Sequence, residues 1–419
     1  MNRQVEVNLS PEEAFGDHLK PALYQKLNLP LEGDVYIRPL RRSIDARSRE
    51  VVVNVLVEVI DSASTPQLIT YQKPQYHVSQ APSVIIVGAG PAGMFAALRL
   101  IELGMKPILF ERGKDVQARR RDIAAINKQH VVNPESNYCF GEGGAGTYSD
   151  GKLYTRSKKR GDVKRILEIL VAHGAKDEII YDAHPHIGTN KLPLLVAELR
   201  QTILACGGEV HFNTCVSEFI VRSGEMKGVV TSDGTRWEAN AVIIATGHSA
   251  RDIFHTLHRQ QIYLEAKPFA LGVRVEHQQQ LIDQVQYHCK TDRGLYLPAS
   301  SYALVHQAKI QGKERGVVWL SVCPGGFNLP AAPTPGGSGV KCKSPTRRDS
   351  RFANSGIVMS IEESDYQKYQ QHGPLAGLYF QSEIEQKACA VAGHSQKAPA
   401  QRLVDFVEKR NSVALLDTS

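Results

Sequence analysis

The sequence predicts an α/β protein whose central unit is a doubly wound parallel sheet, with an α+β unit inserted and a smaller α+β unit before it. Two patterns and the length support this class. Residues 83–113 run strand, glycine turn, helix, strand. A second buried strand, A-V-I-I-A, begins at Ala241. A chain of 419 residues can hold two or three domains with cores of their own.

The amino-acid composition indicates which general classes of protein this chain can belong to. The chain is 42% hydrophobic and 22% charged, as soluble globular proteins are. It shows no secretory apolar run and no membrane-length apolar stretch, so we expect a cytoplasmic protein without a membrane partner. Its seven cysteines form no C-x-x-C pair, which argues against a disulfide framework, a dithiol centre or a metal site. We expect most of them to be small buried apolar residues.

The formal charge is +7, with basic runs at Arg119–Arg121 and Arg156–Arg160. We expect these runs on solvated faces, with attraction of anions as the alternative. No zinc-finger spacing or RNA-binding aromatic motif accompanies them, so nucleic acid is not an expected partner.

The first residues, 1–76, are expected to form the small unit. V-E-V-N-L alternates like a strand, S-P-E-E-A-F-G-D-H-L resembles a capped helix start, and V-V-V-N-V-L-V-E-V-I is a strong strand pattern. The segment 61–82 reads as a connector.

The glycine turn after the first buried strand predicts a dinucleotide site. In G-A-G-P-A-G, Gly88 allows the tight turn, Gly90 lets a pyrophosphate approach, and Gly93 lets the helix pack on the strand. Pro91 and Ala92 open the helix, whose N-terminus favours phosphate. A glycine-rich turn without ligand is the alternative.

Glu111 lies 18 residues after Gly93, near the spacing of about 20 for a carboxylate that binds ribose hydroxyls. An acidic residue there disfavours a 2′-phosphate, so the nucleotide is expected to be FAD or NAD. Arg112 follows it and is assigned to the same site.

G-A-G-P-A-G with F-E-R-G resembles the FAD-binding start of two-dinucleotide-fold flavoproteins, and A-V-I-I-A-T-G-H-S, containing Thr246 and Gly247, resembles their second motif. A bacterial FAD-dependent dehydrogenase family, the NAD(FAD)-utilising dehydrogenases, is similar in six further motifs. These are G-E-G-G-A-G-T-Y-S-D-G-K-L, P-H-I-G-T-N-K-L, K-P-F-A-L-G-V-R-V-E-H, V-C-P-G-G, R-R-D-S-R-F-A-N-S-G and A-P-A-Q-R-L-V-D-F.

The resemblance implies FAD bound in a Rossmann-like FAD/NAD(P)-binding domain at residues 83–254, with a substrate domain inserted at 255–408. Family members continue to a glycine-rich return segment that contacts the cofactor. We expect this chain to lack it and to end in a truncated tail at 409–419, which would leave a sheet edge uncovered and FAD reversibly bound.

The loop Gly141–Gly151 contains five glycines and is expected to contact the flavin. Amides at Gly143, Gly144 and Ala145 can approach it closely, and the hydroxyls of Thr147 and Ser149 add donors. A mobile loop is the alternative.

Other candidates stay open. His184-Pro185-His186 favours a structural or substrate-lining role over a metal site. Arg274 is either a cross-strand partner or a pocket cation. Cys323 is interpreted as a structural thiol rather than a redox thiol, because no second cysteine lies nearby in sequence. The tract 327–346, rich in Pro and Gly, is predicted to be a long irregular loop.

The predicted function is an FAD-dependent oxidoreductase that transfers hydride between FAD and a small organic substrate or NAD(P)H. With one dinucleotide fingerprint, an NAD(P)H donor would bind elsewhere. No hydrolase or NTPase motif occurs. The alternatives are a flavin-dependent RNA-modifying enzyme and a degenerate, non-catalytic nucleotide-binding remnant. The catalytic residues cannot be assigned from these motifs.

Overall fold

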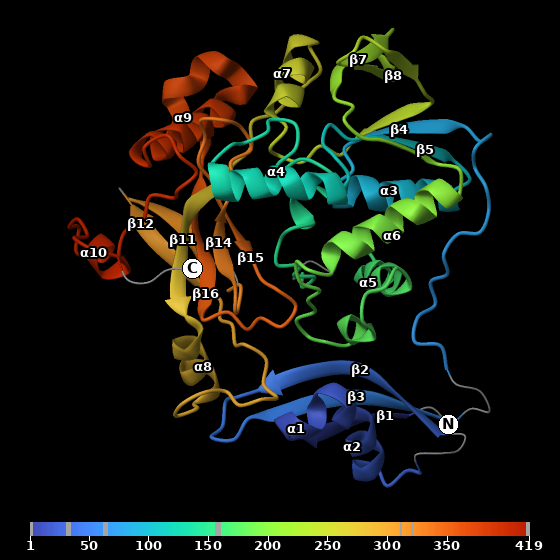
Figure 1. The fold of residues 1–419 in the computed structure, drawn as a ribbon, viewed down its shortest axis with the longest axis vertical. Coiled ribbons are helices and arrows are strands. Elements are labelled where there is room, and N and C mark those ends of the chain that lie inside the picture. Colours follow the sequence, from blue (N-terminus) through green and yellow to red (C-terminus); the bar gives the residue numbers. More distant parts are fainter. Residues whose placement is uncertain are drawn as a thin grey trace.

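The computed structural model describes residues 3–30, 35–61, 66–155, 161–310, 312–319 and 322–415. Figure 1 shows the N-terminal strands at one end, the parallel sheet at the other, and the strands of the inserted unit beside them. The basic run Arg156–Arg160 lies outside the described residues.

The N-terminal unit is an antiparallel sheet of order β1-β3-β2 with helices on one side. Ser10 and Glu13 form the capping box that the sequence indicates. Alternate valines of one strand, Val53, Val55 and Val57, are fully buried against the helices. The elements are β1 (Arg3–Leu9), α1 (Pro11–Ala14), η1 (Gly16–His18), α2 (Leu19–Lys26), β2 (Val35–Asp45) and β3 (Val52–Asp61).

The central sheet has the order β10-β4-β5-β6, and its strands pair in parallel. The chain leaves β4 toward β5 on one side, and β10 later joins on the other. This reversal is the switch point at which doubly wound folds bind ligands. The strands are β4 (Ser83–Val87), β5 (Lys106–Phe110), β6 (Glu209–His211) and β10 (Ala241–Ile244).

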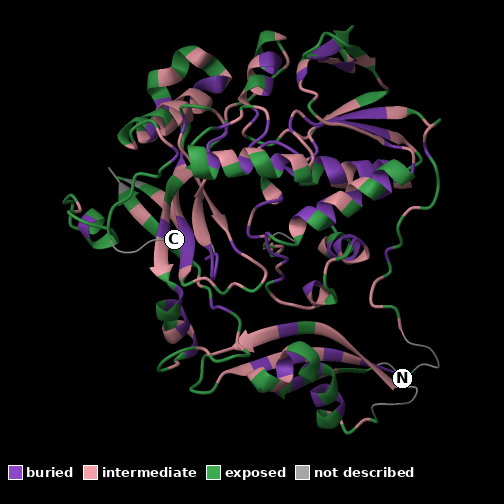
Figure 2. Ribbon diagram, in the orientation of Figure 1, coloured by how far each residue is buried: buried purple, intermediate pink, exposed green. Residues whose placement is uncertain are grey.

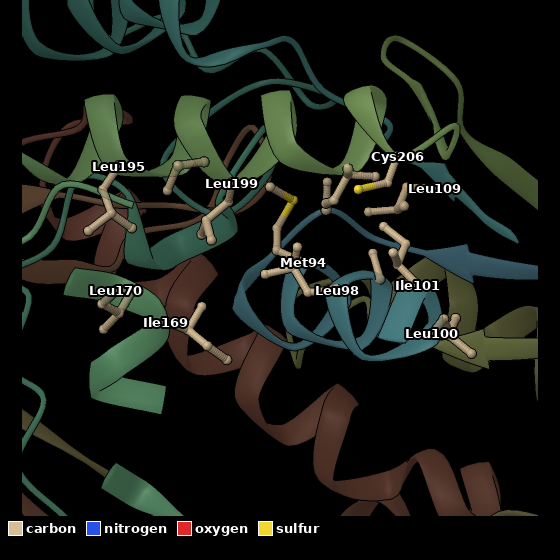
Figure 3. Close-up of a cluster of buried hydrophobic side chains, with 14 of the residues drawn as sticks. Met94, Leu98, Leu100, Ile101, Leu109, Ile169, Leu170, Leu195, Leu199 and Cys206 are labelled. Atoms are coloured by element: carbon tan, nitrogen blue, oxygen red, sulfur yellow. The ribbon is translucent and has the colours of Figure 1, made fainter. Parts of the chain in front are cut away.

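The two central strands, β4 and β5, are buried on both faces, and Figure 2 shows purple along them, whereas the residues of β6 and β10 are intermediate or exposed. Val84 and Ile86 pack under helices on one face, whereas Ile85 and Val87 pack toward a β meander on the other. Figure 3 shows Met94 and Leu98 of the helix after the glycine turn in one hydrophobic cluster with Leu199. This cluster covers the face of the sheet that carries Val84 and Ile86. The helices of this part are α3 (Pro91–Glu102), α4 (Val116–Gln129), η2 (Gly144–Gly146), α5 (Val163–Ala172), η3 (Asp177–Ile180) and α6 (Leu192–Ala205).

A β meander with two hairpins lies between β6 and β10. Turns at Ser223–Gly224 and Asp233–Gly234 join three antiparallel strands. These are β7 (Val216–Arg222), β8 (Glu225–Thr231) and β9 (Arg236–Glu238), and α7 (Arg251–Arg259) follows β10.

The inserted unit is built on an antiparallel sheet of order β11-β16-β13-β12. Its elements are β11 (Phe269–Gln278), α8 (Gln279–Tyr287), β12 (Leu304–Ile310), β13 (Lys313–Trp319), β16 (Phe352–Ile361), η4 (Glu363–Leu375), α9 (Ala376–Val391) and α10 (Leu403–Val407).

The predicted irregular loop at 327–346 is wrong. The tract forms a hairpin of β14 (Phe327–Pro330) and β15 (Val340–Lys343), in which Asn328 is paired with Cys342. Most of its prolines and glycines fall in the connection between the strands, while the ends carry side chains that can pair across a ladder.

Candidate functional site

The carboxyl ends of β4, β5 and β10 open into a cavity of about 490 Å³. It lies at the switch point of the sheet, beside the N-terminus of α3. The predicted residues in its wall are Gly88, Gly90, Pro91, Ala92, Glu111, Arg112, Gly144, Ala145, Thr246 and Gly247.

The three glycines of the first turn differ in the space that surrounds them. Gly88 has φ +106°, and a Cβ there would lie 2.6 Å from the carbonyl oxygen of Ala245. A Cβ at Gly93 would lie 1.9 Å from the Gly88 oxygen. At Gly90 the nearest atom would be the Gly144 Cα at 3.9 Å. Only Gly90 therefore keeps open space for a ligand.

The loop Gly141–Gly151 packs directly on this turn. The Gly143 amide donates to the Ala89 oxygen at 2.8 Å. The wall of the cavity includes Gly144 and Ala145 together with Gly146, whereas Gly143 lies behind them. The loop thus supplies bare backbone to the cavity, as its composition indicates.

Thr147 and Ser149 differ from the expectation. The Thr147 hydroxyl donates to the Glu142 oxygen at 2.7 Å, and the Ser149 hydroxyl donates to the Gly146 oxygen at 2.6 Å. Neither residue lines the cavity. Their hydroxyls close the loop on itself, because its carbonyls are nearer than any ligand in the cavity would be.

Arg119 contradicts the prediction of a solvated basic run. Its side chain is fully buried, and its guanidinium donates to the carbonyls of Asn137, Glu142 and Gly144 at 2.8–2.9 Å. Arg120 and Arg121 are exposed, as expected. Position 119 falls on the apolar helix face of Val116, Ile123 and Ile126, and this periodicity could have identified it.

Glu111 lines the cavity, and most of the acceptor positions of its carboxylate are taken by hydrogen bonds from backbone amides. Its carboxylate accepts hydrogen bonds from the amides of Ala89, Gly113 and Gly141 at 2.8–2.9 Å. A carboxylate has about four acceptor positions, so one remains for a ligand. Glu111 therefore joins both glycine segments at one point.

Arg112 is a fixed cation in the same wall. It donates to Glu135 and Asp252 and stacks on Phe140, 4.5 Å from the ring centroid. Burial opposes its charge, but these two carboxylates raise the pKa of Arg112. The guanidinium keeps its charge and position beside the cavity.

A second cluster begins at Asp150, the last acidic residue of the loop. Its carboxylate lies 3.4 Å from His186, 3.3 Å from Lys152 and 3.1 Å from Arg348. Burial alone would raise the pKa of Asp150, but the neighbouring His186 and the two cations lower it. Sequence reasoning missed Asp150 as a centre, since its partners are spread along the chain.

Arg274 extends this cluster from β11. Its guanidinium donates to Asn354 of β16 and to Asn328 of β14, and it lies 3.8 Å from the Cys323 sulfur. Burial lowers the pKa of Arg274. The interpretation as a cross-strand partner therefore holds, whereas Arg274 lines neither the cavity of about 490 Å³ nor the cleft of about 1080 Å³ beside the N-terminal sheet.

Cys323 is bonded to Cys342, which corrects the expectation of a thiol without a nearby partner. The two cysteines are separated by 19 residues, and the β14–β15 hairpin brings them together. No C-x-x-C spacing in the sequence indicates this pair.

Within the part of the chain that the structure describes, four buried polar atoms of this cluster have no hydrogen-bond partner: Asp150 Oδ1 and His186 Nε2, which face each other at 3.4 Å, Arg348 Nε and Asn354 Nδ2. Buried polar groups are normally paired, so such a concentration is typical of a binding site. Among the described residues no group of His, Cys, Asp and Glu is arranged to hold a metal.

A cleft of about 1080 Å³ leads to this cluster. It lies between the N-terminal sheet, which contributes Arg42, and the segment that carries His184 and His186. Arg348 also lines it. Burial lowers the pKa of His186, outweighing the opposite effect of Asp150.

The fold and the cavity define a dinucleotide-binding α/β protein. Residues 268–419 match the family described as "FAD-dependent protein, C-terminal domain-like", and residues 1–60 match a domain of unknown function, DUF8436. No helix in the described ranges has the length and apolarity needed to cross a membrane.

An "Uncharacterized protein" of Clostridium beijerinckii is 34% identical over 426 residues, covering 98% of this chain and 78% of that protein. The thiamine thiazole synthase of Aeropyrum pernix is 30% identical, covering 40% of this chain and 55% of the synthase. The tRNA uridine 5-carboxymethylaminomethyl modification enzyme MnmG of Lactobacillus delbrueckii subsp. bulgaricus is 30% identical, covering 42% of this chain and 25% of that enzyme.

The chain belongs to the same family as the Clostridium beijerinckii protein, a family of FAD-utilising flavoproteins. Its cofactor is FAD. The open space at Gly90 and the remaining acceptor position of Glu111 fit this cofactor.

Proposed function

We propose that the protein is an FAD-dependent oxidoreductase, of the dehydrogenase type, that transfers hydride between FAD and a small organic substrate. One observation carries this proposal. A single loop lines the dinucleotide cavity at Gly144–Gly146 and ends in the polar cluster at Asp150. Cofactor and substrate would therefore be held by the two ends of one rigid segment.

Gly90 and the neighbouring helix N-terminus would hold the pyrophosphate, and Glu111 would accept a hydrogen bond from a ribose hydroxyl. Thr246 and Gly247 line the opposite side of the cavity. FAD, when bound, supplies the two-electron chemistry that the side chains lack.

The cluster would bind and orient the substrate. Arg348 has an unpaired Nε beside Asp150, which suits an oxygen acceptor such as a carboxylate or carbonyl. A proton released from substrate would be held at His186 Nε2, where ionised Asp150 lies 3.4 Å away and stabilises the imidazolium. The cleft supplies the path from solvent.

The test starts with a visible absorbance spectrum of the purified chain and identification of the released flavin. Candidate small molecules are then screened without oxygen, with bleaching of the flavin absorbance as the readout. Once a substrate is found, His186→Gln should slow bleaching by about a hundredfold or more, the usual size of a general acid–base contribution.

Arg347→Met is the matched control for Arg348→Met, since Arg347 is an exposed neighbour that also lines the cleft. Arg348→Met should impair bleaching while FAD content stays complete, and the control should not. Unchanged bleaching in both His186→Gln and Arg348→Met would exclude this cluster as the substrate site.

A further inference from the structure

The Cys323–Cys342 pair lies within the polar cluster, not at the surface of the inserted unit. Cys323 is 1% exposed and Cys342 is half-buried. We propose that this pair is a reversible two-electron redox centre that a small dithiol opens, with Lys152 holding the Cys323 sulfur as a thiolate. This goes beyond hydride transfer at the flavin and stands on this chain's residues alone.

The surroundings of the Cys323 sulfur favour a negative charge. Lys152 Nζ lies 2.9 Å from it, and Arg274 Nη2 lies 3.8 Å from it. A cysteine beside Lys or Arg is a better thiolate, and hence a better leaving group in exchange.

The other charged groups nearby act in both directions. Asp150, 3.3 Å from Lys152, opposes a thiolate, whereas Arg348 favours it. Glu276 of β11 accepts a hydrogen bond from Asn328, and Lys343 is next to Cys342 on β15. Lys152 and Arg274 contact the Cys323 sulfur directly, whereas Asp150 contacts Lys152. The two cations therefore have the larger effect on the charge of the sulfur.

The difference in burial sets the direction of attack. A dithiol, entering as a thiolate, forms a bond to the Cys342 sulfur, and the S–S bond breaks with its electron pair leaving on Cys323. The second sulfur of the dithiol then displaces Cys342 as a thiolate, which takes up a proton, and the dithiol becomes a cyclic disulfide. Two electrons pass to the protein, and Cys323 remains a thiolate beside Lys152.

A purely structural bridge would behave differently. It would stabilise the β14–β15 hairpin and resist reduction until the chain unfolds. The two roles are separated by reducing the full-length chain under native conditions.

The first experiment treats the full-length chain with dithiothreitol, traps thiols with iodoacetamide after brief denaturation, and locates the label by mass spectrometry. We expect both cysteines to be labelled while circular dichroism stays unchanged, and the bond to reform when oxidised dithiothreitol replaces the reduced form. Labels that appear only after the circular dichroism signal is lost would overturn the proposal.

The second experiment follows thiolate absorbance of the reduced chain against pH. The midpoint for Cys323, obtained by difference from Cys323→Ser, should lie at least about one unit below the usual value near 8.5. Lys152→Met should raise it by about one unit and slow reduction by about three- to tenfold.

Lys343→Met is the matched control, because this lysine is also partly buried but successive side chains of a strand face opposite ways. It should change neither the midpoint nor the rate. If Lys152→Met behaves like this control, the assignment to Lys152 is wrong. Should Cys323→Ser fail to fold, Cys342→Ser leaves Cys323 as the remaining thiol of the pair, and the difference between its titration with and without Lys152→Met still reports on Lys152.

Discussion

The dinucleotide turn and the Asp150 cluster lie at the two ends of one loop, yet they are built by opposite means. Residues 88–93 are contiguous and present backbone, with glycine where a side chain would collide. Asp150 and Arg348 are 198 residues apart and present charged side chains. The turn therefore depends on the absence of side chains, whereas the cluster depends on their charge and placement.

This difference predicts different sensitivities. A single Cβ should disable the first region without altering the second, whereas a change of charge should disable the second and leave FAD in place. The substitutions below test that separation, beginning with the largest expected effect.

Gly90→Val should abolish FAD binding, because a β-branched side chain would fill the open space that the pyrophosphate needs. Flavin fluorescence titration measures this, and we expect at least a thousandfold loss, equivalent to about 4 kcal/mol. Gly316→Val is the control, since a Cβ there meets nothing within 4 Å at an ordinary φ. Tight FAD binding by Gly90→Val would show that the turn is not the cradle.

Arg119→Met should destabilise the fold by about 3–5 kcal/mol, because three buried carbonyls of the loop lose their donor. Chemical denaturation gives the free energy of unfolding. Arg120→Met, on the exposed side of the same helix, should change it by less than about 0.5 kcal/mol. Equal effects at the two positions would contradict the buried role of Arg119.

Glu111→Ala should weaken FAD binding by about ten- to a hundredfold, since charge-assisted hydrogen bonds contribute roughly 1.5–3 kcal/mol. The structure adds a loss of stability, because three amides lose their acceptor. Glu111→Gln keeps one acceptor oxygen, so its dissociation constant for FAD should lie between those of the native chain and Glu111→Ala. An unchanged dissociation constant in Glu111→Ala would show that this carboxylate does not reach the ribose.

The smallest effect is the pH dependence at Asp150. The pKa of Asp150 is lower in the folded chain than in the unfolded chain. As pH falls, the folded state therefore takes up a proton at this carboxylate later than the unfolded state does. The resulting stability is complete above about pH 4, the ordinary range for Asp, and is lost as pH falls through the folded pKa.

Denaturation at a series of pH values should therefore show a shallower acid loss in Asp150→Asn than in the native chain. Asp349→Asn changes a nearby carboxylate for which the structure shows no such partners and serves as the control. Parallel acid limbs in Asp150→Asn and the native chain would show that Asp150 is not held ionised by its neighbours.

The sequence by itself determined the central fold and the dinucleotide turn. The strand, helix and strand around the glycine turn and the second buried strand from Ala241 lie where it predicts them. These features depend on periodicity and on backbone conformations that few residues other than glycine adopt. Such requirements are local, so neighbouring residues reveal them.

Only the tertiary structure decided the β14–β15 hairpin, the Cys323–Cys342 pair and the cluster at Asp150. Lys152, Arg274 and Cys323 have no common spacing, so no local sequence pattern indicates that they lie together. The role proposed for them depends on electrostatics over a few ångströms, and only the packing of the inserted sheet against the glycine loop sets those distances.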